Sequence, residues 1–466
     1  MLPSLAFASW GGAGGGGGDA RALLAAASIT IGAGAALWFG FKGHRGGLGK
    51  REGFLVAASG WAVASLFGCL PFLISGAIPS FTDAYFETMS GFTTTGASIL
   101  SDIEAMPRGI LFWRATTHWI GGMGILLLSI AILPLLGVGG MQLFNAEVSH
   151  VTVEKLTPRI SQTARLLWFF YLALTVILIA VYFADGMPLF DAIAHSFATV
   201  ASGGFSTKNA SMAHYPSMLT QYVTIAGMFL AGASFTLHVR AARGKSLKPY
   251  GRDNEFVAYS VIVIVASILV FFGIPHDMHA GLEGRARAAL FQVVSLVSST
   301  GYITSDYGLW SPAAQMVLLM MMIPGGCAGS TAGGMKIMRV ILLLKSWKNE
   351  IRKLVHPRGI FVVRLNGNAV APDIISAVQG FLIAYVSLFA LCTVALTALG
   401  LDPLSAASAV ISSMSNIGPG LGSVGAVENF GHVAGAGKWI LSLCMLMGRL
   451  ELFTILVLFS PSLWKK

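Results

Sequence analysis

Long apolar segments recur along the whole chain and predict helices that cross a membrane. Nine of them stand out, at residues 22–41, 53–78, 112–137, 164–183, 216–239, 256–274, 311–345, 376–400 and 436–460. A helix of about 20 apolar residues spans the hydrocarbon core of a bilayer, and each segment is about that long or longer. The pattern therefore predicts an all-α polytopic membrane protein.

Four shorter, semi-polar stretches lie between these spans, and each ends in a glycine: Gly96, Gly204, Gly301 and Gly418. They are too short to cross a bilayer, so we interpret them as re-entrant pore helices followed by loops. The glycines are 108, 97 and 117 residues apart, and each interval contains a span, a basic segment and a second span. This regularity predicts four internal repeats of span, pore helix, loop and span around one pore.

The repeats divide the chain into five parts. We expect an extra N-terminal helix or helices in residues 1–50, and pore repeats at 51–150, 151–252, 253–365 and 366–466. The third repeat would contain an intramembrane gating loop.

The composition excludes the main soluble classes. Of the 466 residues, 55% are apolar and 11% charged, against about 25% charged in soluble domains. We therefore expect neither a soluble enzyme nor a disordered chain.

The basic residues set the predicted orientation. The net charge is +10, and 20 of the 30 Lys and Arg lie at residues 42–51, 155–165, 240–252, 345–364 and 465–466. These segments flank apolar spans, as cytoplasmic loops do, so the positive charge does not indicate nucleic-acid binding. With these segments inside, all four glycine loops open on the outer face.

Four equivalent loops around one axis suit a cation, because backbone carbonyls can replace its hydration shell. Glycine permits the turn that points them inward, and each pore helix directs its partly negative C-terminal end at the ion. For a single triplet, close helix packing is the better explanation of the small residues, but it does not explain four such triplets together. The predicted filter residues are Thr94, Thr95, Gly96, Ser202, Gly203, Gly204, Ser299, Thr300, Gly301, Asn416, Ile417 and Gly418.

Polar residues also precede the glycines at fixed distances. Asp83 and Asp191 stand thirteen residues before, and we interpret them as helix caps or outer-mouth charges rather than proton carriers. Glu87, His195 and Gln292 stand nine before. His195 has no second ligand at metal spacing, so we expect it to form hydrogen bonds in the protein interior.

The span at 311–345 is interrupted by a glycine-rich stretch, 324–334, whose backbone must be buried or line a cavity. It is not a phosphate-binding loop, because Ile337 follows Lys336 where Ser or Thr is required. Arg449, inside the last span, is expected to point into the pore or at the carbonyls of this stretch, with snorkelling to the inner surface as the alternative. The predicted gate residues are Gly325, Gly326, Gly329, Ser330, Thr331, Gly333, Gly334, Lys336 and Arg449.

Several motifs together resemble the TrkH potassium-uptake family. They lie at 93–97 (TTTGA), 203–207 (GGFST), 325–331 (GGCAGST), 416–420 (NIGPG), 136–142 (LGVGGMQ) and 448–451 (GRLE). The resemblance implies a homodimer in the bacterial inner membrane and a cytosolic nucleotide-binding partner of the TrkA type. It also implies that the four glycines line the filter, that the glycine-rich stretch gates, and that Arg449 is an internal barrier. Members of this family usually have two spans before the first repeat. Here only 22–41 qualifies and residues 2–10 would be a remnant of the other, so we expect a truncated first helix or a start upstream.

The function expected is potassium uptake, driven largely by the membrane potential, with K⁺ as transported ion, no covalently bound cofactor and no enzymatic activity. Coupling to H⁺ or Na⁺ stays open. One alternative is a secondary transporter of another solute built on broken helices, which predicts two inverted repeats and a midplane site. Another is a membrane enzyme, which needs a nucleophile and base together inside the spans. Cation flux in proteoliposomes separates the three.

Overall fold

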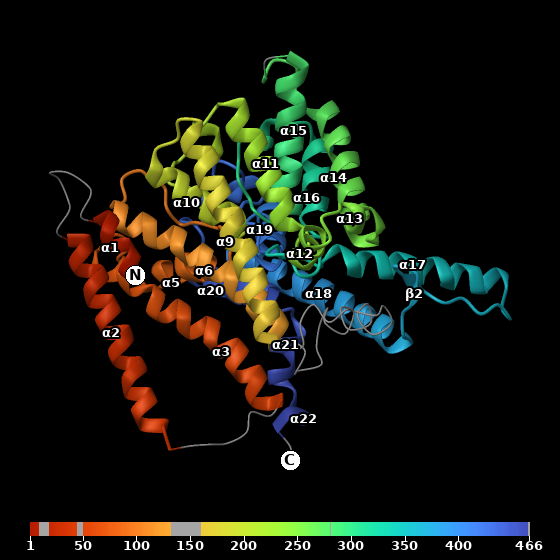
Figure 1. The fold of residues 1–466 in the computed structure, drawn as a ribbon, viewed down its shortest axis with the longest axis horizontal. Coiled ribbons are helices and arrows are strands. Elements are labelled where there is room, and N and C mark those ends of the chain that lie inside the picture. Colours follow the sequence, from red (N-terminus) through yellow and green to blue (C-terminus); the bar gives the residue numbers. More distant parts are fainter. Residues whose placement is uncertain (9–17, 44–49, 132–159, 280, 465–466) are drawn as a thin grey trace.

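The computed structural model describes residues 1–8, 18–43, 50–131, 160–279 and 281–464 (Figure 1). The end of the expected span 112–137, the motif at 136–142 and the boundary at 150/151 lie outside the described residues. So do residues 44–49 and 155–159 of the basic segments 42–51 and 155–165, and residues 465–466.

The regular secondary structure of the described residues is helical apart from one hairpin of two short strands. The elements follow the expected repeat. Before the first repeat lie α1 (Leu2–Ala8) and α2 (Gly18–Phe41). The first repeat contains α3 (Lys50–Gly68), α4 (Leu70–Ile74), pore helix α5 (Phe81–Phe92) and α6 (Arg108–Ala131). The second contains α9 (Ile160–Ala184), pore helix α10 (Leu189–Val200), η1 (Ser211–His214), α11 (Met218–Gly232), α12 (Phe235–Arg243) and α13 (Lys248–Arg252).

The third and fourth repeats continue the same order. The third contains α14 (Asn254–Gly273), pore helix α15 (Gly281–Val297), η2 (Tyr307–Leu309), α16 (Pro312–Met321), α17 (Ile337–Val355) and the antiparallel hairpin β1 (Arg364–Leu365) and β2 (Asn368–Ala369). The fourth contains α18 (Pro372–Ala398), pore helix α19 (Pro403–Ser415), η3 (Gly422–Val424), α20 (Gly435–Arg449), α21 (Phe453–Leu456), η4 (Val457–Phe459) and α22 (Pro461–Trp464). Figure 1 shows α2 at one edge of the molecule and α17 projecting from the other.

Burial separates the pore helices from the spans. In α19 all residues from Ser408 to Ser415 are buried, whereas α9 and α14 expose large apolar side chains such as Phe169 and Phe272. An exposed apolar face on a long helix is what a lipid-facing span requires. Five described helices are long and apolar enough to cross a membrane, or up to seven when each sharply bent pair is counted as one span.

The second span is interrupted in the second, third and fourth repeats. The sequence predicted the interruption between α16 and α17, and it gave 216–239 and 436–460 as spans without foreseeing a bend in either. The structure bends both, by 98° between α11 and α12 and by 109° between α20 and the α21–η4 segment. At the second bend Glu451 and Leu452 have φ values of 57° and 23°, which no continuous helix accommodates.

Candidate ion pore and gate

Each pore helix ends in the same hydrogen-bonded turn, just before its loop glycine. In the first repeat, Thr94 N–H donates to the Gly91 carbonyl (3.0 Å) and Thr95 N–H to the Ser90 carbonyl (2.8 Å). The bond equivalent to Thr95–Ser90 recurs at 2.9, 2.8 and 2.9 Å in the other repeats, as Gly203–Ala198, Thr300–Ser295 and Ile417–Ser412. This pair of bonds is a Schellman motif, which satisfies the last helix carbonyls and turns the chain out of the helix.

The residue two before each glycine adopts a left-handed conformation. Its φ is 52° at Thr94, 53° at Ser202, 54° at Ser299 and 53° at Asn416. Glycine usually occupies this position after a helix, and here short polar side chains do. One backbone construction is therefore repeated four times under four different triplets.

The loop glycines close the four loops into a ring. Their φ values are 83°, 75°, 77° and 104° in chain order. A Cβ on each glycine would meet the carbonyl oxygen before the glycine of the following repeat: Gly96 meets Gly203, Gly204 meets Thr300, Gly301 meets Ile417 and Gly418 meets Thr95. Since the fourth contact returns to the first repeat, the loops surround one axis with their backbone carbonyls side by side.

One cavity borders this ring, and a second lies at the glycine-rich stretch. All four loop glycines line one of about 170 Å³, together with Ser98, Lys208 and Glu428 from the outer loops. The other, of about 40 Å³, is lined by the glycine-rich loop, Lys336, Arg449 and Glu451. The space on the glycine-rich side is thus much smaller and carries two basic side chains.

In the first three repeats, a polar residue nine positions before the loop glycine fastens the pore helix to its returning loop. Glu87 accepts bonds from the Ser98 hydroxyl and Ile99 N–H, both 2.9 Å. Glu87 also forms a fully buried ion pair of 2.7 Å with Arg114, whose guanidinium lies 3.5 Å from the centroid of the Phe205 ring. The buried pair therefore joins the first loop to the second.

His195 and Gln292 act in the same way. The two ring nitrogens of His195 lie 2.8 Å from the Asp191 carbonyl and 2.9 Å from the Ser206 hydroxyl, and Gln292 Nε2 lies 3.4 Å from the Thr304 hydroxyl. The described residues contain no cluster of three or more His, Cys, Asp and Glu that could hold a metal. His195 therefore serves in hydrogen bonding.

Asp83 and Asp191, which stand thirteen residues before loop glycines, are not the N-caps of their pore helices. The expectation that they are helix caps is corrected. The N-caps of α5 and α10 are Ser80 and Pro188, and the acids lie in the first helical turn instead. Asp83 pairs with Lys438 at 2.5 Å, and Asp191 lies 3.8 Å from Lys208. In the first turn a carboxylate still interacts favourably with the helix dipole.

An Asn209 clamp joins the outer loops of the first two repeats. The Asn209 amide donates to Asp102 at 2.9 Å and accepts from Ile103 N–H at 2.6 Å. The hydrogen bonds from Asn209 and from the backbone of Ala105 and Glu104 lower the pKa of Asp102. The carboxylate is the form that accepts these bonds, so it is the form the clamp requires.

The gate loop, residues 322–336 between α16 and α17, packs directly beneath the ring. The Thr331 hydroxyl lies 2.8 Å from the Ser202 hydroxyl, and Gly333 N–H donates to the Ser299 hydroxyl at 2.6 Å. Both serine residues are left-handed positions of the ring. Side chains of the ring therefore hold the gate loop in place.

The bend between α11 and α12 supplies the gate loop with backbone partners. Cys327 N–H donates to the Gly232 carbonyl (2.8 Å), and Phe235 N–H donates to the Gly329 carbonyl (3.0 Å). These bonds satisfy groups that an irregular loop at membrane depth would otherwise leave unpaired. The bend in the second repeat thus supports the gate loop of the third repeat, which the sequence around the bend does not indicate.

Arg449 reaches the gate loop from α20. Its guanidinium donates to the Thr331 carbonyl at 2.7 Å and to the Gly121 carbonyl of α6 at 3.2 Å. It is 3% exposed and therefore does not snorkel to the surface. One side chain bridges the gate loop and a span of the first repeat.

Two carboxylates and two further cations hold the ends of the gate loop. Glu255 of α14 accepts from Ala328 N–H (2.8 Å) and Met338 N–H (3.0 Å). Lys336 donates to the Ala332 carbonyl at 2.7 Å. Arg339 pairs with Glu451, and it also lies 4.2 Å from the Phe381 ring centroid.

The family model of TrkH, described as a cation transport protein, matches residues 20–466 of this chain, which include all four repeats. The chain belongs to the TrkH family. It is 41% identical over 442 residues to the Trk system potassium uptake protein TrkH of Vibrio parahaemolyticus, covering 94% of this chain and 91% of that protein. It is likewise 41% identical over 446 residues to the Escherichia coli K12 protein of the same name, with the same coverage.

A solved structure agrees with the fold. The crystal structure of the potassium transporter TrkH from Vibrio parahaemolyticus matches with a TM-score of 0.90 and 38% identity, over 100% of this chain and 96% of that chain. The expected family, the all-α polytopic fold and its membrane-spanning character are confirmed.

In this member of the TrkH family, the structure brings all twelve predicted filter residues into the ring and its turns. Six of the nine predicted gate residues line the small cavity, and the other three, Gly325, Gly326 and Thr331, lie in the gate loop. The sequence reasoning missed Glu255, whose position at the start of an apolar span was the available signal. It also missed Gly121 and Ser299 as partners of the gate, because those contacts join residues more than 30 positions apart.

Proposed function

We propose that this protein is a channel-like potassium transporter that takes up K⁺ across the bacterial inner membrane. The observation that carries the proposal is the closed ring of four loops, in which each glycine abuts a carbonyl of the next repeat. The relatives quoted above are named as potassium uptake proteins, which supports K⁺ as the ion.

In this proposal the carbonyls of the ring replace the water around K⁺, and no bound cofactor takes part. The C-terminal ends of the four pore helices add a partial negative potential. Each 100 mV of membrane potential, inside negative, contributes roughly 2.3 kcal/mol per cation, enough for about 50-fold accumulation.

The gate loop blocks the path on the inner side in this proposal. Arg449 adds positive charge below the ring and ties the loop to α6 through two carbonyls. Such a loop switches when a small energy gap separates its blocking and withdrawn positions. The five glycines at Gly325, Gly326, Gly329, Gly333 and Gly334 favour this, since each disfavours a continuous helix by about 1 kcal/mol.

A cytosolic TrkA-type nucleotide-binding protein would dock on the basic segments 240–252 and 345–364, which include α12, α13 and α17. Because α17 begins immediately after the gate loop, movement of that helix would pull the loop directly. Two copies of the chain would form a homodimer in the lipid bilayer. The positive-inside rule places the basic segments in the cytoplasm and the four glycine loops outside.

The deciding experiment is growth of a potassium-uptake-deficient bacterium in low-potassium medium, with K⁺ flux in proteoliposomes beside it. We expect rescue by the unmodified chain and its loss in Gly301→Ser at equal membrane abundance. Flux of an organic solute without any K⁺ flux would favour instead the secondary transporter built on broken helices, for which the three interrupted spans are the structural argument.

A further inference from the structure

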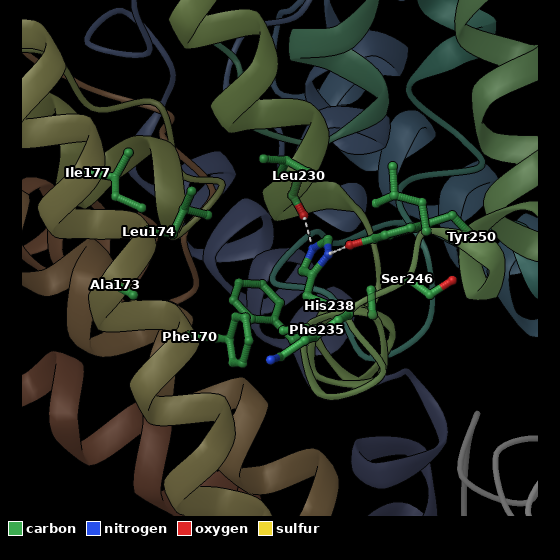
Figure 2. Close-up of a pocket in the computed structure, with 13 residues that line it drawn as sticks. Phe170, Ala173, Leu174, Ile177, Leu230, Phe235, His238, Ser246 and Tyr250 are labelled. Carbon is green, nitrogen blue, oxygen red and sulfur yellow. Dashed lines mark hydrogen bonds between the residues drawn. The ribbon is translucent and has the colours of Figure 1, made fainter.

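A cavity of about 520 Å³ lies between α9 and the region from α11 to α13, away from the ring. Its walls include Phe170, Leu174 and Ile177 of α9, together with Leu230 and Phe235 on the two sides of the α11–α12 bend (Figure 2). The volume falls within the roughly 300–1,000 Å³ of small-molecule sites. None of the filter or gate residues is among the described residues that line it.

The interior of the cavity presents mostly hydrocarbon to an occupant. His238 lies among the lining residues, with one ring nitrogen 2.7 Å from the Tyr250 hydroxyl and the other 2.9 Å from the Leu230 carbonyl (Figure 2). Because both nitrogens have protein partners, the histidine needs none from a ligand. The remaining polar lining is Lys245 and Ser246, in the turn between α12 and α13.

Lys245 provides an exposed cation beside this apolar space. It takes part in none of the ion pairs within the described parts of the chain. Arg240 and Lys248 nearby in sequence add to the basic character of this turn. An apolar cavity with lysine and serine beside it complements a molecule that has a hydrocarbon chain and an anionic head.

The cavity is accessible from the lipid side of α9. Ile177, one of its lining residues, is 57% exposed, and Val176 next to it is 55% exposed. On the topology proposed above, the turn at Lys245 lies on the cytoplasmic side, where bilayers carry anionic phospholipids. A lipid tail can therefore enter sideways from the leaflet while its headgroup stays at the basic turn.

We propose that this cavity binds an anionic phospholipid, with one acyl chain between α9 and α12 and the headgroup phosphate at Lys245 and Ser246. Phe235 forms a wall of the site, and its N–H donates to the Gly329 carbonyl of the gate loop. A bound lipid therefore contacts a residue whose backbone supports that loop. Binding itself does not depend on which ion passes the ring.

Native mass spectrometry of the delipidated full chain, titrated with dioleoyl phosphatidylglycerol or dioleoyl phosphatidylcholine, tests the site. Ala173→Trp fills the cavity from α9, and Val176→Trp is its control, because it adds the same side chain to the outward face. Lys245→Gln removes the cation, and Lys348→Gln is its control, because Lys348 is an exposed lysine of α17 outside the residues that line the cavity. We expect phosphatidylglycerol to be retained preferentially, with the preference lost in Ala173→Trp and affinity lowered about fivefold in Lys245→Gln.

Equal retention of the two lipids by the unmodified chain would overturn the anionic site. So would unchanged phosphatidylglycerol binding in Ala173→Trp. If that variant is not monodisperse, Ala242→Trp fills the same cavity from α12 and replaces it. A change in the ratio of dimer to monomer at unchanged lipid binding would assign this face to contact between copies of the chain, and would also overturn the proposal.

Discussion

Arg449 donates a hydrogen bond of 2.7 Å to the carbonyl oxygen of Thr331, across 118 positions of sequence. Thr331 in turn contacts Ser202 of the ring through its hydroxyl. Arg449, the gate loop and the ring of loop glycines are thus connected through hydrogen bonds. A substitution in any one of the three is therefore expected to alter the contacts of the other two.

Removing the arginine tests the block directly. Arg449→Ala deletes both the positive charge and the two carbonyl contacts, so we expect K⁺ flux in proteoliposomes to rise without any partner protein. Arg449→Lys keeps the charge but loses the forked geometry that reaches two carbonyls. Flux near the unmodified level in Arg449→Lys would mean that the positive charge contributes more to the block than the hydrogen bonds to the Thr331 and Gly121 carbonyls. Unchanged flux in both Arg449→Ala and Arg449→Lys would place the gate elsewhere.

Shortening the gate loop is a second route to the same open state. Deletion of residues 328–331 removes the contacts to Ser202, to the α11–α12 bend and to Arg449. We expect partner-free K⁺ flux to increase. A deletion variant that inserts normally and stays as closed as the unmodified protein would contradict this role of the loop.

Glu255 is predicted to hold the loop in its blocking position. Glu255→Ala leaves the N–H groups of Ala328 and Met338 without this acceptor, at a cost of about 1–3 kcal/mol for each unsatisfied group. The loop should then open more often and raise partner-free flux. Glu350→Ala, which removes an exposed carboxylate from α17, should leave the flux unchanged.

A side chain at the ring should impair ion selection. Gly301→Ser brings a Cβ onto the Ile417 carbonyl and must also adopt a φ of 77°. We expect K⁺/Na⁺ discrimination to fall by about tenfold, equivalent to about 1.4 kcal/mol. Gly400→Ser is the control, since Gly400 also has a positive φ (102°) but open space around it; equal effects of the two variants would remove Gly301 from the filter.

Reversing charge on α17 should weaken docking of the soluble partner. The change is Lys348, Arg352 and Lys353 to Glu, and we expect partner binding to fall, with a loss that is larger at low salt. The control reverses Arg21, Arg108 and Arg287, which changes the net charge equally on segments predicted to face outward. Unchanged binding of the soluble partner after the α17 charge reversal would contradict this docking surface.

The sequence by itself determined the class of the protein and the positions of the four loop glycines that form the ring. Apolar segments of membrane-spanning length indicate helices that cross a bilayer. Glycines at near-regular intervals mark the four loops in the sequence. These are properties of local composition and spacing, which chain folding does not alter. The break before Lys336 was visible for the same reason, since a run of glycines cannot form a stable helix.

Only the tertiary structure decided how the loops meet and what holds the gate. The left-handed positions are Thr94, Ser202, Ser299 and Asn416, and none is a glycine that would mark the turn in the sequence. The bends after Gly232 and Arg449 also escaped the sequence, because apolar residues continue through both. At the first bend, the Gly232 carbonyl and the Phe235 N–H bond to the distant gate loop. A hydropathy pattern shows which residues are buried away from water. It does not show the partners of a buried polar group, because these come from segments far away in the chain, as they do for Glu255 and Arg449.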